Sequence, residues 1–466
     1  MSEEMKSTAP GALPEVSRRS ALSLLAAGAA ASTLGGTDLA AAAVARRPLL
    51  GSPLQIAAER RILGLLGDAR LKQIQAELRA ELLATPRGQL RTSIASLDES
   101  IAQWTNSLIF AEILRLSPQP GPLWMTDDTP RTWFGHTLPG VGTSGDNPDA
   151  IYRCSSLEGG GTYEMVGRFP ARNRASQIVV QISPVDQTKP TLEMTPTANP
   201  GKAFTHVASL TDKDLPVRPD GTFRITFGPN PGGPNHYVVP PHRVTLSTRD
   251  LLADWRQRPC DYVVRRIDRP SAGVFDDRLL REGVYADLPG YVRFWAKFPD
   301  VWLKGLKANQ RSGVVARAGG WGFQVGMCYD LADDEAMLVK AGPSAAAFTG
   351  FQVMNPWMIA ADAKRFQCSL NRSQVRFNPD QSITYVIANR DPGVANWLDT
   401  AGWPQGFGLM RWQAVPASET GDGLIQDFRV IKLAELAGMA DLPRVTPAER
   451  RRSLAKRPPD YAARTT

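Results

Sequence analysis

The feature that most constrains the fold is an internal similarity between two stretches of the chain, about 160 residues apart. The first, residues 219–249, has Pro-Asp-Gly before an apolar strand, then a Pro-Gly-Gly-Pro-Asn-His turn and an apolar strand that ends in arginine. The second, residues 379–411, follows the same order with Pro-Asp-Gln and Pro-Gly-Val-Ala-Asn-Trp. Gln181 and Gln352 lie in matching apolar strands earlier in each half. The similarity predicts two related modules that pack together.

Both modules have the sequence pattern of antiparallel β structure. From Trp124 onward, short alternating apolar runs are broken by Gly, Pro, Asn and Asp. Turns at short, regular intervals favour an antiparallel sandwich or barrel over a parallel α/β sheet, in which long helices would intervene. We expect two short helices in this region, at residues 248–255 and 291–306, and a hairpin turn at residues 158–161.

Helices flank the predicted modules. Apolar residues recur at helical spacing in residues 54–83 and 92–116, with charged residues on the opposite face, and Pro118 ends the second stretch. The predicted fold class is therefore mainly β (α+β), with an N-terminal helical region followed by two related antiparallel β-sandwich-like modules. The predicted divisions are a signal peptide at residues 1–45, a helical region at 46–120, modules at 121–270 and 271–442, and a basic, solvated C-terminal helix and tail at 443–466.

The N-terminus predicts export. Arg18-Arg19 precedes an apolar run at residues 21–31, and Ala43-Val44-Ala45 offers an A-x-A cleavage site. The run is far short of the roughly 20 residues that span a bilayer. We interpret this segment as a twin-arginine signal that engages the twin-arginine export machinery. We therefore expect a periplasmic or extracellular protein with no transmembrane span in its mature chain. Export in the folded form permits a cofactor.

Composition argues against several classes of protein. The formal net charge is +8, and the seven Lys/Arg and two Asp/Glu of residues 444–464 account for +5 of it, so the rest of the chain is only mildly basic. Without a basic stripe mixed with aromatics, nucleic-acid binding is not expected. The cysteines form no C-x-x-C pair, which argues against structural zinc and redox motifs, while an oxidising compartment permits disulfides of undetermined pairing. The four cysteines are Cys154, Cys260, Cys328 and Cys368.

Two short motifs resemble a known family. Residues 387–399 read I-A-N-R-D-P-G-V-A-N-W-L-D, and residues 146–153 read D-N-P-D-A-I-Y-R. Both are similar to motifs of the domain-of-unknown-function 1214 family, and the resemblance covers residues 130–412. It implies a β-rich fold, but the family has no settled activity and supplies no catalytic residue. The first-half copy departs from the signature, with His236 in place of Trp.

The loop that begins at Asp146 is a candidate catalytic site. Asp146 and Asp149 flank an Asn-Pro pair and are followed by Arg153, a candidate substrate-binding residue. Carboxylates at this spacing suit general acid and base roles or a hard divalent cation. The same residues also make an ordinary turn, because Asx side chains cap their own backbone.

A lone histidine provides the candidate general base. His236, with Asn235 beside it as a substrate-binding candidate, lies in the turn of the first repeat. Histidine has an unperturbed pKa near neutrality, which suits proton transfer. The alternative is a hydrogen-bonded structural histidine. If the modules pack about a pseudo-twofold axis, His236 and Trp397 would occupy related positions and face one cleft.

Polar and aromatic residues gather in the turn of the second repeat. Such a mixture suits recognition of a sugar or a carboxylated aromatic. The alternative is an Arg-Asp salt bridge that holds a hairpin, with the tryptophan in the core. Trp357 adds an aromatic residue that either lines a cleft or fills core. The substrate-binding candidates of the turn are Arg390, Asp391, Asn396 and Trp397.

These patterns lead to a functional hypothesis. Nucleophile elbows, phosphate loops and dinucleotide fingerprints are absent from the sequence, so no organic cofactor is predicted, and the four histidines lack metal-ligand spacing. We expect an exported cell-envelope enzyme that acts on a carbohydrate or a related polar small molecule by acid/base hydrolysis or elimination. The alternative is a non-catalytic periplasmic protein that binds an apolar or aromatic ligand. The sequence leaves open which of the two it is.

Overall fold

Four long helices form one side of the protein. The computed structural model describes residues 50–184, 186–190, 207–271, 273–317 and 320–465. The predicted signal segment therefore lies outside the described residues. Ser52 and Asp68 cap the first two helices, and the apolar faces of all four helices share one core around Trp104 and Leu108. The helices are α3 (Pro53–Leu65), α4 (Ala69–Leu83), α5 (Arg91–Leu116) and α6 (Asp277–Trp302).

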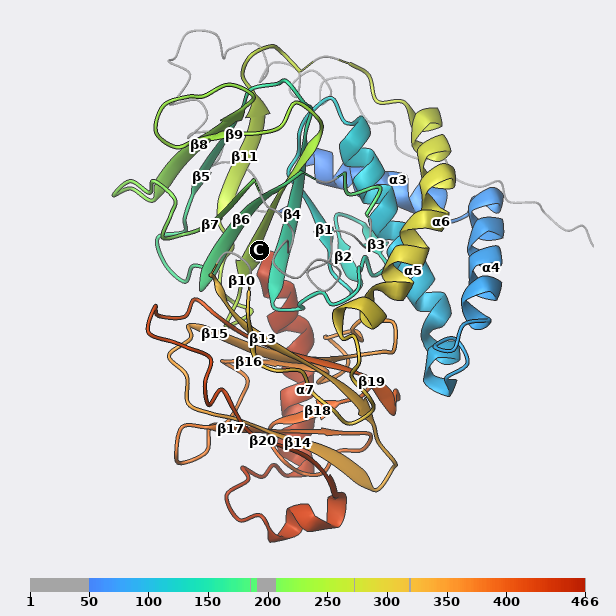
Figure 1. The fold of residues 1–466 in the computed structure, drawn as a ribbon, viewed down its shortest axis with the longest axis vertical. Helices are drawn as coiled ribbons and strands as arrows, with labels where there is room; N and C mark the ends of the chain where they lie inside the picture. Colours follow the sequence, from blue (N-terminus) through green and yellow to red (C-terminus); the bar gives the residue numbers. More distant parts are fainter. Residues whose placement is uncertain (1–49, 185, 191–206, 272, 318–319, 466) are drawn as a thin grey trace, which may run out of the picture. The chain divides into compact units, whose positions relative to one another are not determined.

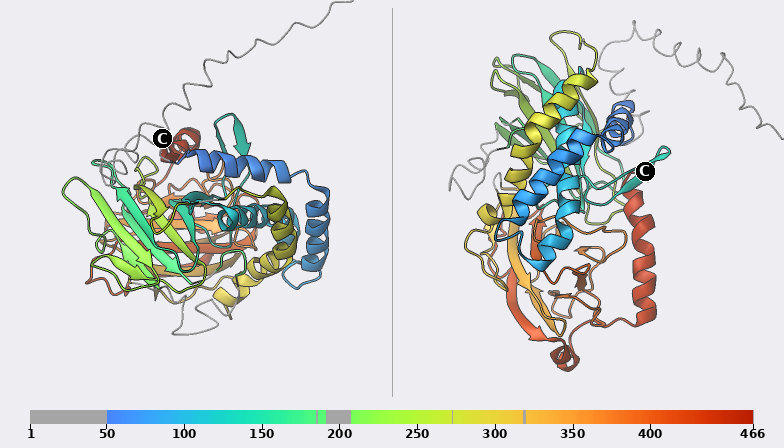
Figure 2. Two further views of the ribbon diagram at one scale, coloured as in Figure 1. Left: turned by 90° about the horizontal axis from the view of Figure 1, so that it is seen from above. Right: turned by 90° about the vertical axis from the view of Figure 1, so that its right-hand side faces the viewer.

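The prediction for α6 was wrong at its start. The helix begins at Asp277, where the Asp276 side chain accepts hydrogen bonds from the first turn, well before the predicted residue 291. Its buried residues Leu280, Val284 and Leu288 pack into the helical core. This helix therefore packs with α3–α5 (Figure 2), and only its C-terminal end, at Phe298 and Trp302, also contacts the second module.

The first module is a sandwich of two sheets. One has the order β1-β4-β10-β6-β7 and the other β11-β5-β8-β9. Their bounds are β1 (Leu123–Thr126), β4 (Ala150–Leu157), β5 (Tyr163–Arg168), β6 (Gln177–Ser183), β7 (Ala208–Thr211), β8 (Thr222–Gly228), β9 (His236–Val238), β10 (Val244–Leu251) and β11 (Asp261–Arg266). A separate ribbon pairs β2 (Arg131–Trp133) with β3 (His136–Leu138).

The second module repeats this topology. Its sheets have the orders β12-β13-β19-β15-β16 and β18-β17-β14-β20, and each strand from β13 to β20 takes the place of the corresponding strand from β4 to β11. The bounds are β12 (Val315–Ala316), β13 (Gly322–Asp330), β14 (Glu335–Ala341), β15 (Phe348–Met354), β16 (Ser369–Asn371), β17 (Ile383–Ala388), β18 (Trp397–Asp399), β19 (Gln405–Gln413) and β20 (Ile425–Lys432).

The register of the strands confirms the predicted repeat. His236 opens β9 and pairs in parallel with Thr226 of β8, and Trp397 opens β18 and pairs in parallel with Val386 of β17. The backbone N–H of Thr226 donates to the carbonyl of Asn235, and that of Val386 donates to the carbonyl of Asn396. The fold is mainly β with two sandwich-like modules, as the sequence predicts.

The two modules stack with their five-stranded sheets on the inside (Figure 1). Alternation along β10 turns Leu246 into the sandwich core, whereas Leu251 contacts Phe348 of β15 in the other module. Nearby, Asp149 accepts hydrogen bonds from Trp255 Nε1 at 2.7 Å and Asn371 Nδ2 at 3.0 Å. Gly350 permits this approach, because a Cβ there would lie 2.9 Å from Asp149 Oδ2.

Two local predictions were wrong. Residues 248–251 extend β10 instead of starting a helix, because both neighbouring strands pair with them. Residues 158–161 join β4 to β5, which lie in different sheets, so this turn is a corner between sheets and not a hairpin.

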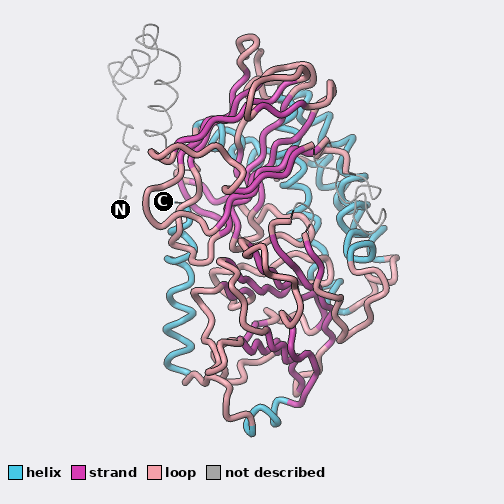
Figure 3. The backbone as a smooth tube through the Cα atoms, turned by 60° about the vertical axis from the view of Figure 1, so that its left-hand side comes forward, coloured by secondary structure: helices cyan, strands magenta, loops and turns pink. Residues whose placement is uncertain are grey.

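The C-terminal segment was predicted to be a solvated helix and tail. The helix is present and most of its residues are exposed, but one face is buried, which the prediction missed. Helix α7 (Pro447–Ala462) runs along the second module on a different side from α3–α6, as Figure 3 shows. Arg450, Arg457 and Arg464, spaced seven residues apart, are buried. Two short 3₁₀ helices, η3 (Leu433–Gly438) and η4 (Ala463–Thr465), flank α7 in sequence.

Two further findings concern the membrane and the thiols. None of the helices in the described ranges combines the length and the apolar character needed to cross a bilayer. The four cysteines are free thiols, and burial raises the pKa of Cys154 to about 11.

Candidate functional site

Three arginines gather where the two five-stranded sheets face each other. Arg249 lies on β10, Arg411 on β19, and Arg317 directly follows β12. We call these three residues the interface arginines. Arg249 pairs across the sheet with Tyr152 and Val179, and Arg411 pairs with Gln324 and Gly350 of the equivalent strands. The two repeats therefore each place one arginine at the same position of the inner sheet.

Aromatic rings lie under two of the interface arginines. The guanidinium of Arg317 lies 4.0 Å from the ring centroid of Trp321, and that of Arg249 lies 5.2 Å from the same ring. Arg249 is also 5.8 Å from the ring of Tyr152. Such contacts stabilise a partly desolvated cation without neutralising it.

Arg411 is fixed in place by hydrogen bonds. Its guanidinium donates to Gln352 Oε1 at 3.0 Å and to the carbonyl of Gly145. Gln352 in turn donates to the carbonyl of Asp146, so β19, β15 and the loop before β4 are joined at one point. Arg411 is buried, whereas Arg249 and Arg317 are half-buried.

The interface arginines carry positive charge without a matching carboxylate. Within the described part of the chain, none of the three forms an ion pair. Burial lowers the pKa of Arg317 well below its ordinary value, and the charges of Arg249 and Arg411 lower it further. Burial also lowers the pKa of Arg411. Partly buried charge of one sign is unfavourable unless an opposite charge binds beside it.

The carboxyl group of Asp146 interacts electrostatically with Arg411 and Arg249. Its side chain accepts hydrogen bonds from Thr143 Oγ1, at 2.9 Å to Oδ2 and 3.0 Å to Oδ1. Burial raises its pKa to about 6, although the Thr143 hydrogen bonds and the charges of Arg411 and Arg249 act in the opposite direction. A carboxyl group with such a pKa exchanges protons readily near neutral pH.

Several polar atoms on the inner faces lack a partner among the residues that the structure describes. Gln352 of the second module binds Arg411, but the equivalent Gln181 leaves its Oε1 unpartnered among the described residues. The Nε of Arg317 is likewise buried without a hydrogen bond, and no described residue accepts a hydrogen bond from the Arg249 guanidinium. Arg317, which belongs to the second module, does donate from Nη1 to Gln324 Oε1. Unbonded polar atoms among the described residues therefore occur in both modules at this interface.

Two of the predicted residues near this loop have structural contacts instead. Asp149 is fully buried, and Trp255 and Asn371 bind its Oδ1. Arg153 lies inside the first sandwich, where it pairs with Asp250 at 2.6 Å. Neither is placed to contact a ligand, and only Asp146 of this group joins the interface arginines.

His236 does not join the cluster. Its Nδ1 lies 2.8 Å from Thr226 Oγ1 within the same sheet, and no carboxylate among the described residues bonds to it. Asn235 is exposed, with a φ of 65° that the turn requires. His236 and Trp397 are equivalent in the repeat, but each lies in an outer, four-stranded sheet, and no described contact joins them. The prediction that they face one cleft gains no support.

In the turn of the second repeat, the structure matches the alternative in which an Arg-Asp salt bridge holds the turn and the tryptophan lies in the core. Asn396 is buried and binds the carbonyl of Arg376 at 2.7 Å, and Trp397 is buried with its Nε1 on the carbonyl of Ala388. The salt bridge that holds this turn joins Asp391 to Arg450 of α7, at 3.0 Å.

Two predicted substrate-binding residues remain. Arg390 points into solvent and pairs with the exposed Asp333. Trp357 is buried against Trp104, and its Nε1 donates to the carbonyl of Ser93. The interface arginines were missed as a site. The signal for them was that Arg249 and Arg411 end the matching strands of the two repeats.

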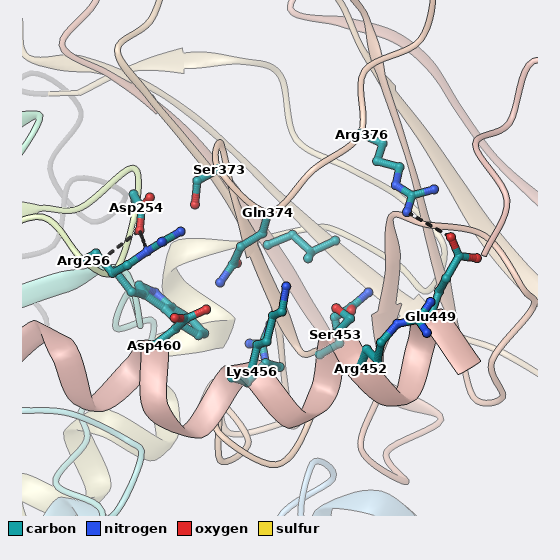
Figure 4. A pocket seen from close by; sticks show the side chains of 14 residues that line it. Asp254, Arg256, Ser373, Gln374, Arg376, Glu449, Arg452, Ser453, Lys456 and Asp460 are labelled. Atoms are coloured by element: carbon teal, nitrogen blue, oxygen red, sulfur yellow. Dashed lines mark hydrogen bonds and ion pairs between the residues drawn. The ribbon is translucent and has the colours of Figure 1, made fainter. Parts of the chain in front are cut away.

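A polar groove runs along α7 (Figure 4). It has a volume of 460 Å³ and lies between α7, the turn that contains Asp254 and Arg256, and the loop of Ser373 to Arg376. Its cations are partly neutralised, since Arg256 pairs with Asp254 at 3.3 Å and Arg376 with Glu449 at 3.8 Å. Water solvates its exposed charges, so the groove lacks the desolvated, unpaired charge of the interface arginines.

The described residues contain no group of three or more His, Cys, Asp or Glu side chains that could hold a metal ion. No protein-family model and no curated protein matches this chain. Among solved structures, the chain is similar to an uncharacterized protein from Burkholderia cenocepacia, with a TM-score of 0.62 and 20% identity over 81% of this chain and 99% of that one. A Vibrio parahaemolyticus protein has a TM-score of 0.37 and 9% identity, over 72% and 98% of the two chains. The first likeness supports the fold alone.

Proposed function

We propose that this protein is an exported enzyme that acts on a small, polar, anionic molecule, such as an acidic carbohydrate, at the interface arginines. The observation that carries the proposal is three guanidiniums, with no carboxylate partner in the described ranges, beside a carboxyl group whose pKa burial raises to about 6. Location in the cell envelope rests on the twin-arginine signal predicted from residues 1–45.

The arginines would bind the anionic group. A guanidinium presents a planar fork of donors that matches the two oxygens of a carboxylate or phosphate. No described residue accepts a hydrogen bond from the Arg249 guanidinium, whereas Gln352 and Gly145 hold Arg411 in one orientation. A ligand would therefore meet a site whose charge is already in place, which lowers the cost of ordering it on binding.

Asp146 would transfer protons in hydrolysis or elimination. At a pH near its pKa, both the carboxylic acid and the carboxylate are populated, so one group serves as acid or base. The hydroxyl of Tyr152 accepts a hydrogen bond from the backbone N–H of Asn147, beside Asp146. Burial raises the pKa of Tyr152 and keeps this hydroxyl protonated as a donor near the cluster.

The alternative of an apolar ligand is not favoured by these contacts, because arginine, glutamine and aspartate side chains line the interface. A non-catalytic protein that binds an anion remains the alternative reading of the same residues. The two differ in the role of Asp146, which only the enzyme requires for turnover.

A comparison of acidic and neutral sugars tests the proposal. Glucuronate and glucose differ by one carboxylate, and a ligand at 100 times its Kd raises the free energy of unfolding by about 2.7 kcal/mol. We expect glucuronate, but not glucose, to raise the Tm of the wild type, and Arg249→Gln to abolish the effect. Arg256→Gln, at an exposed arginine outside the cluster, is the matched control.

The catalytic half needs a second readout. Glycosides of uronic acids are incubated with the wild type and with Asp146→Asn, and release of reducing ends or of unsaturated products is followed. We expect turnover to fall by a factor of about 100 or more in the variant, while anion binding persists. Binding without turnover in the wild type would favour the non-catalytic alternative, and stabilisation that survives Arg249→Gln would contradict the site itself.

A further inference from the structure

We infer that the ligand of the interface arginines is a small dianion. The inference rests on the proposed function and makes its substrate class more specific. It comes from the charge balance of the described side chains at the interface and from the equivalent placement of Arg249 and Arg411 in the two repeats.

The positive charges of the interface arginines outnumber the negative charges beside them. The three guanidiniums contribute three positive charges, and the neighbouring groups that act on Arg317 are the two other arginines and Tyr152. Asp146 supplies at most one negative charge to the cluster. Asp149 also acts on Arg411, but Arg464 and Arg457 of the C-terminal segment already act on Asp149. At least two positive charges therefore remain without a counter-charge.

The interface arginines lie in partly desolvated surroundings. Arg411 is buried, and Arg249 and Arg317 are half-buried, so water screens them less than it screens surface cations. A monoanion would leave one charge uncompensated at the interface. A dianion would neutralise the cluster, and an ion pair in partly desolvated surroundings is stronger than the same pair at the surface.

Some N–H groups of the interface arginines have no described hydrogen-bond partner. Among the described residues, Arg249 and the Nε of Arg317 lack hydrogen-bond partners, although Arg317 donates from Nη1 to Gln324. Arg411 uses its guanidinium only for Gln352 and Gly145 in the same part of the chain. Arg249 and Arg411 come from equivalent positions of the two modules. Oxygens of one ligand would thus accept hydrogen bonds from both modules at once.

The same charge occurs in two chemical classes, dicarboxylates and phosphoryl groups. Both present two negative charges and several acceptor oxygens in a small volume. Succinate and inorganic phosphate are therefore the probes, and monomethyl succinate is the matched probe that keeps the size of succinate but carries one charge less.

The test is isothermal titration of the full chain with the three probes. We expect succinate or phosphate to bind at least about tenfold more tightly than monomethyl succinate, a ratio that corresponds to about one lost charge contact. Arg249→Gln should remove the preference, and Arg249→Lys should keep part of it, with folding of both checked by circular dichroism. A phosphate response alone would assign the dianion to the phosphoryl class, and a succinate response alone to the dicarboxylates.

The contradicting outcomes differ for the two proposals. Equal affinity for succinate and monomethyl succinate, lost in Arg249→Gln, would overturn the dianion and leave the anion site in place. Equal binding in the wild type and in Arg249→Gln, or no binding of any of the three probes together with no effect of glucuronate, would overturn both.

Discussion

The buried arginines of the C-terminal segment and the buried or half-buried interface arginines differ in their partners. On α7 and η4, each of Arg450, Arg457 and Arg464 meets carbonyl or carboxylate oxygens. Arg464 pairs with Asp127 at 2.6 Å and donates to the carbonyl of Pro148. The interface arginines have no carboxylate partner among the described residues. The comparison teaches that burial of an arginine is structural where its donors are satisfied and suggests a ligand where they are not.

Removing a satisfied arginine should give the largest effect. Arg464→Ala leaves Asp127 buried, with Tyr461 as its remaining described side-chain hydrogen-bond donor. We expect the free energy of unfolding to fall by about 3 to 5 kcal/mol, measured by urea denaturation. Arg451→Ala, on the exposed face of α7, is the control and should change it by less than about 0.5 kcal/mol. If Arg464→Ala lowered the free energy of unfolding only slightly, the distinction between the arginines of the C-terminal segment and the interface arginines would be lost.

The second prediction concerns pH. Because the pKa of Asp146 is raised from 3.8 to about 6 in the folded protein, the folded state binds a proton more tightly than the unfolded state. The free energy of unfolding should therefore decrease as pH rises from about 4 to about 7, by up to about 3 kcal/mol from this group. Urea denaturation across this range should show a flatter profile for Asp146→Asn, whereas Asp333→Asn, at an exposed carboxylate, should keep the wild-type slope.

Removing an unsatisfied arginine should have little effect on stability and a clear effect on binding. Arg249→Gln removes repulsion with Arg317 and Arg411, so we expect an unchanged or slightly raised Tm without ligand. Anion affinity should fall by a factor of about 10 to 100, the range for hydrogen bonds to a charged group. A loss of stability as large as that of Arg464→Ala would show that the two sets are alike.

The smallest effect is expected at an exposed ion pair. Arg390 and Asp333 are 2.7 Å apart, with 69% and 70% of their side chains exposed. Arg390→Gln should alter the free energy of unfolding by less than about 0.5 kcal/mol and leave anion binding unchanged. Any loss of binding in this variant would return the second-repeat turn to consideration as a site.

Patterns local in sequence were sufficient to predict the fold. The repeat gave two related modules because turn residues and alternating apolar residues specify strands over short distances, as at 222–228 and 383–388. The extent of α6 and the continuation of β10 were missed because tertiary packing, not local propensity, decides them.

The site was harder to predict because it depends on which charges find partners. Arg464 and Asp127 are 337 positions apart, and nothing in their local sequence indicates that they pair. The residues next to Arg249 and Arg411 in the sequence do not show whether the fold places a carboxylate beside either guanidinium. Asp146 was found because a carboxylate in a Gly-rich loop is conspicuous, but its raised pKa comes from burial that the sequence does not report.

The position of α7 has a consequence for the order of folding. During synthesis the two sandwiches emerge before α7, and each has its own core. Asp127, which directly follows β1 of the first sandwich, stays without Arg464 until almost all of the sequence has been translated. The contact between Asp127 and Arg464 therefore forms after the contacts between the two sandwiches can form.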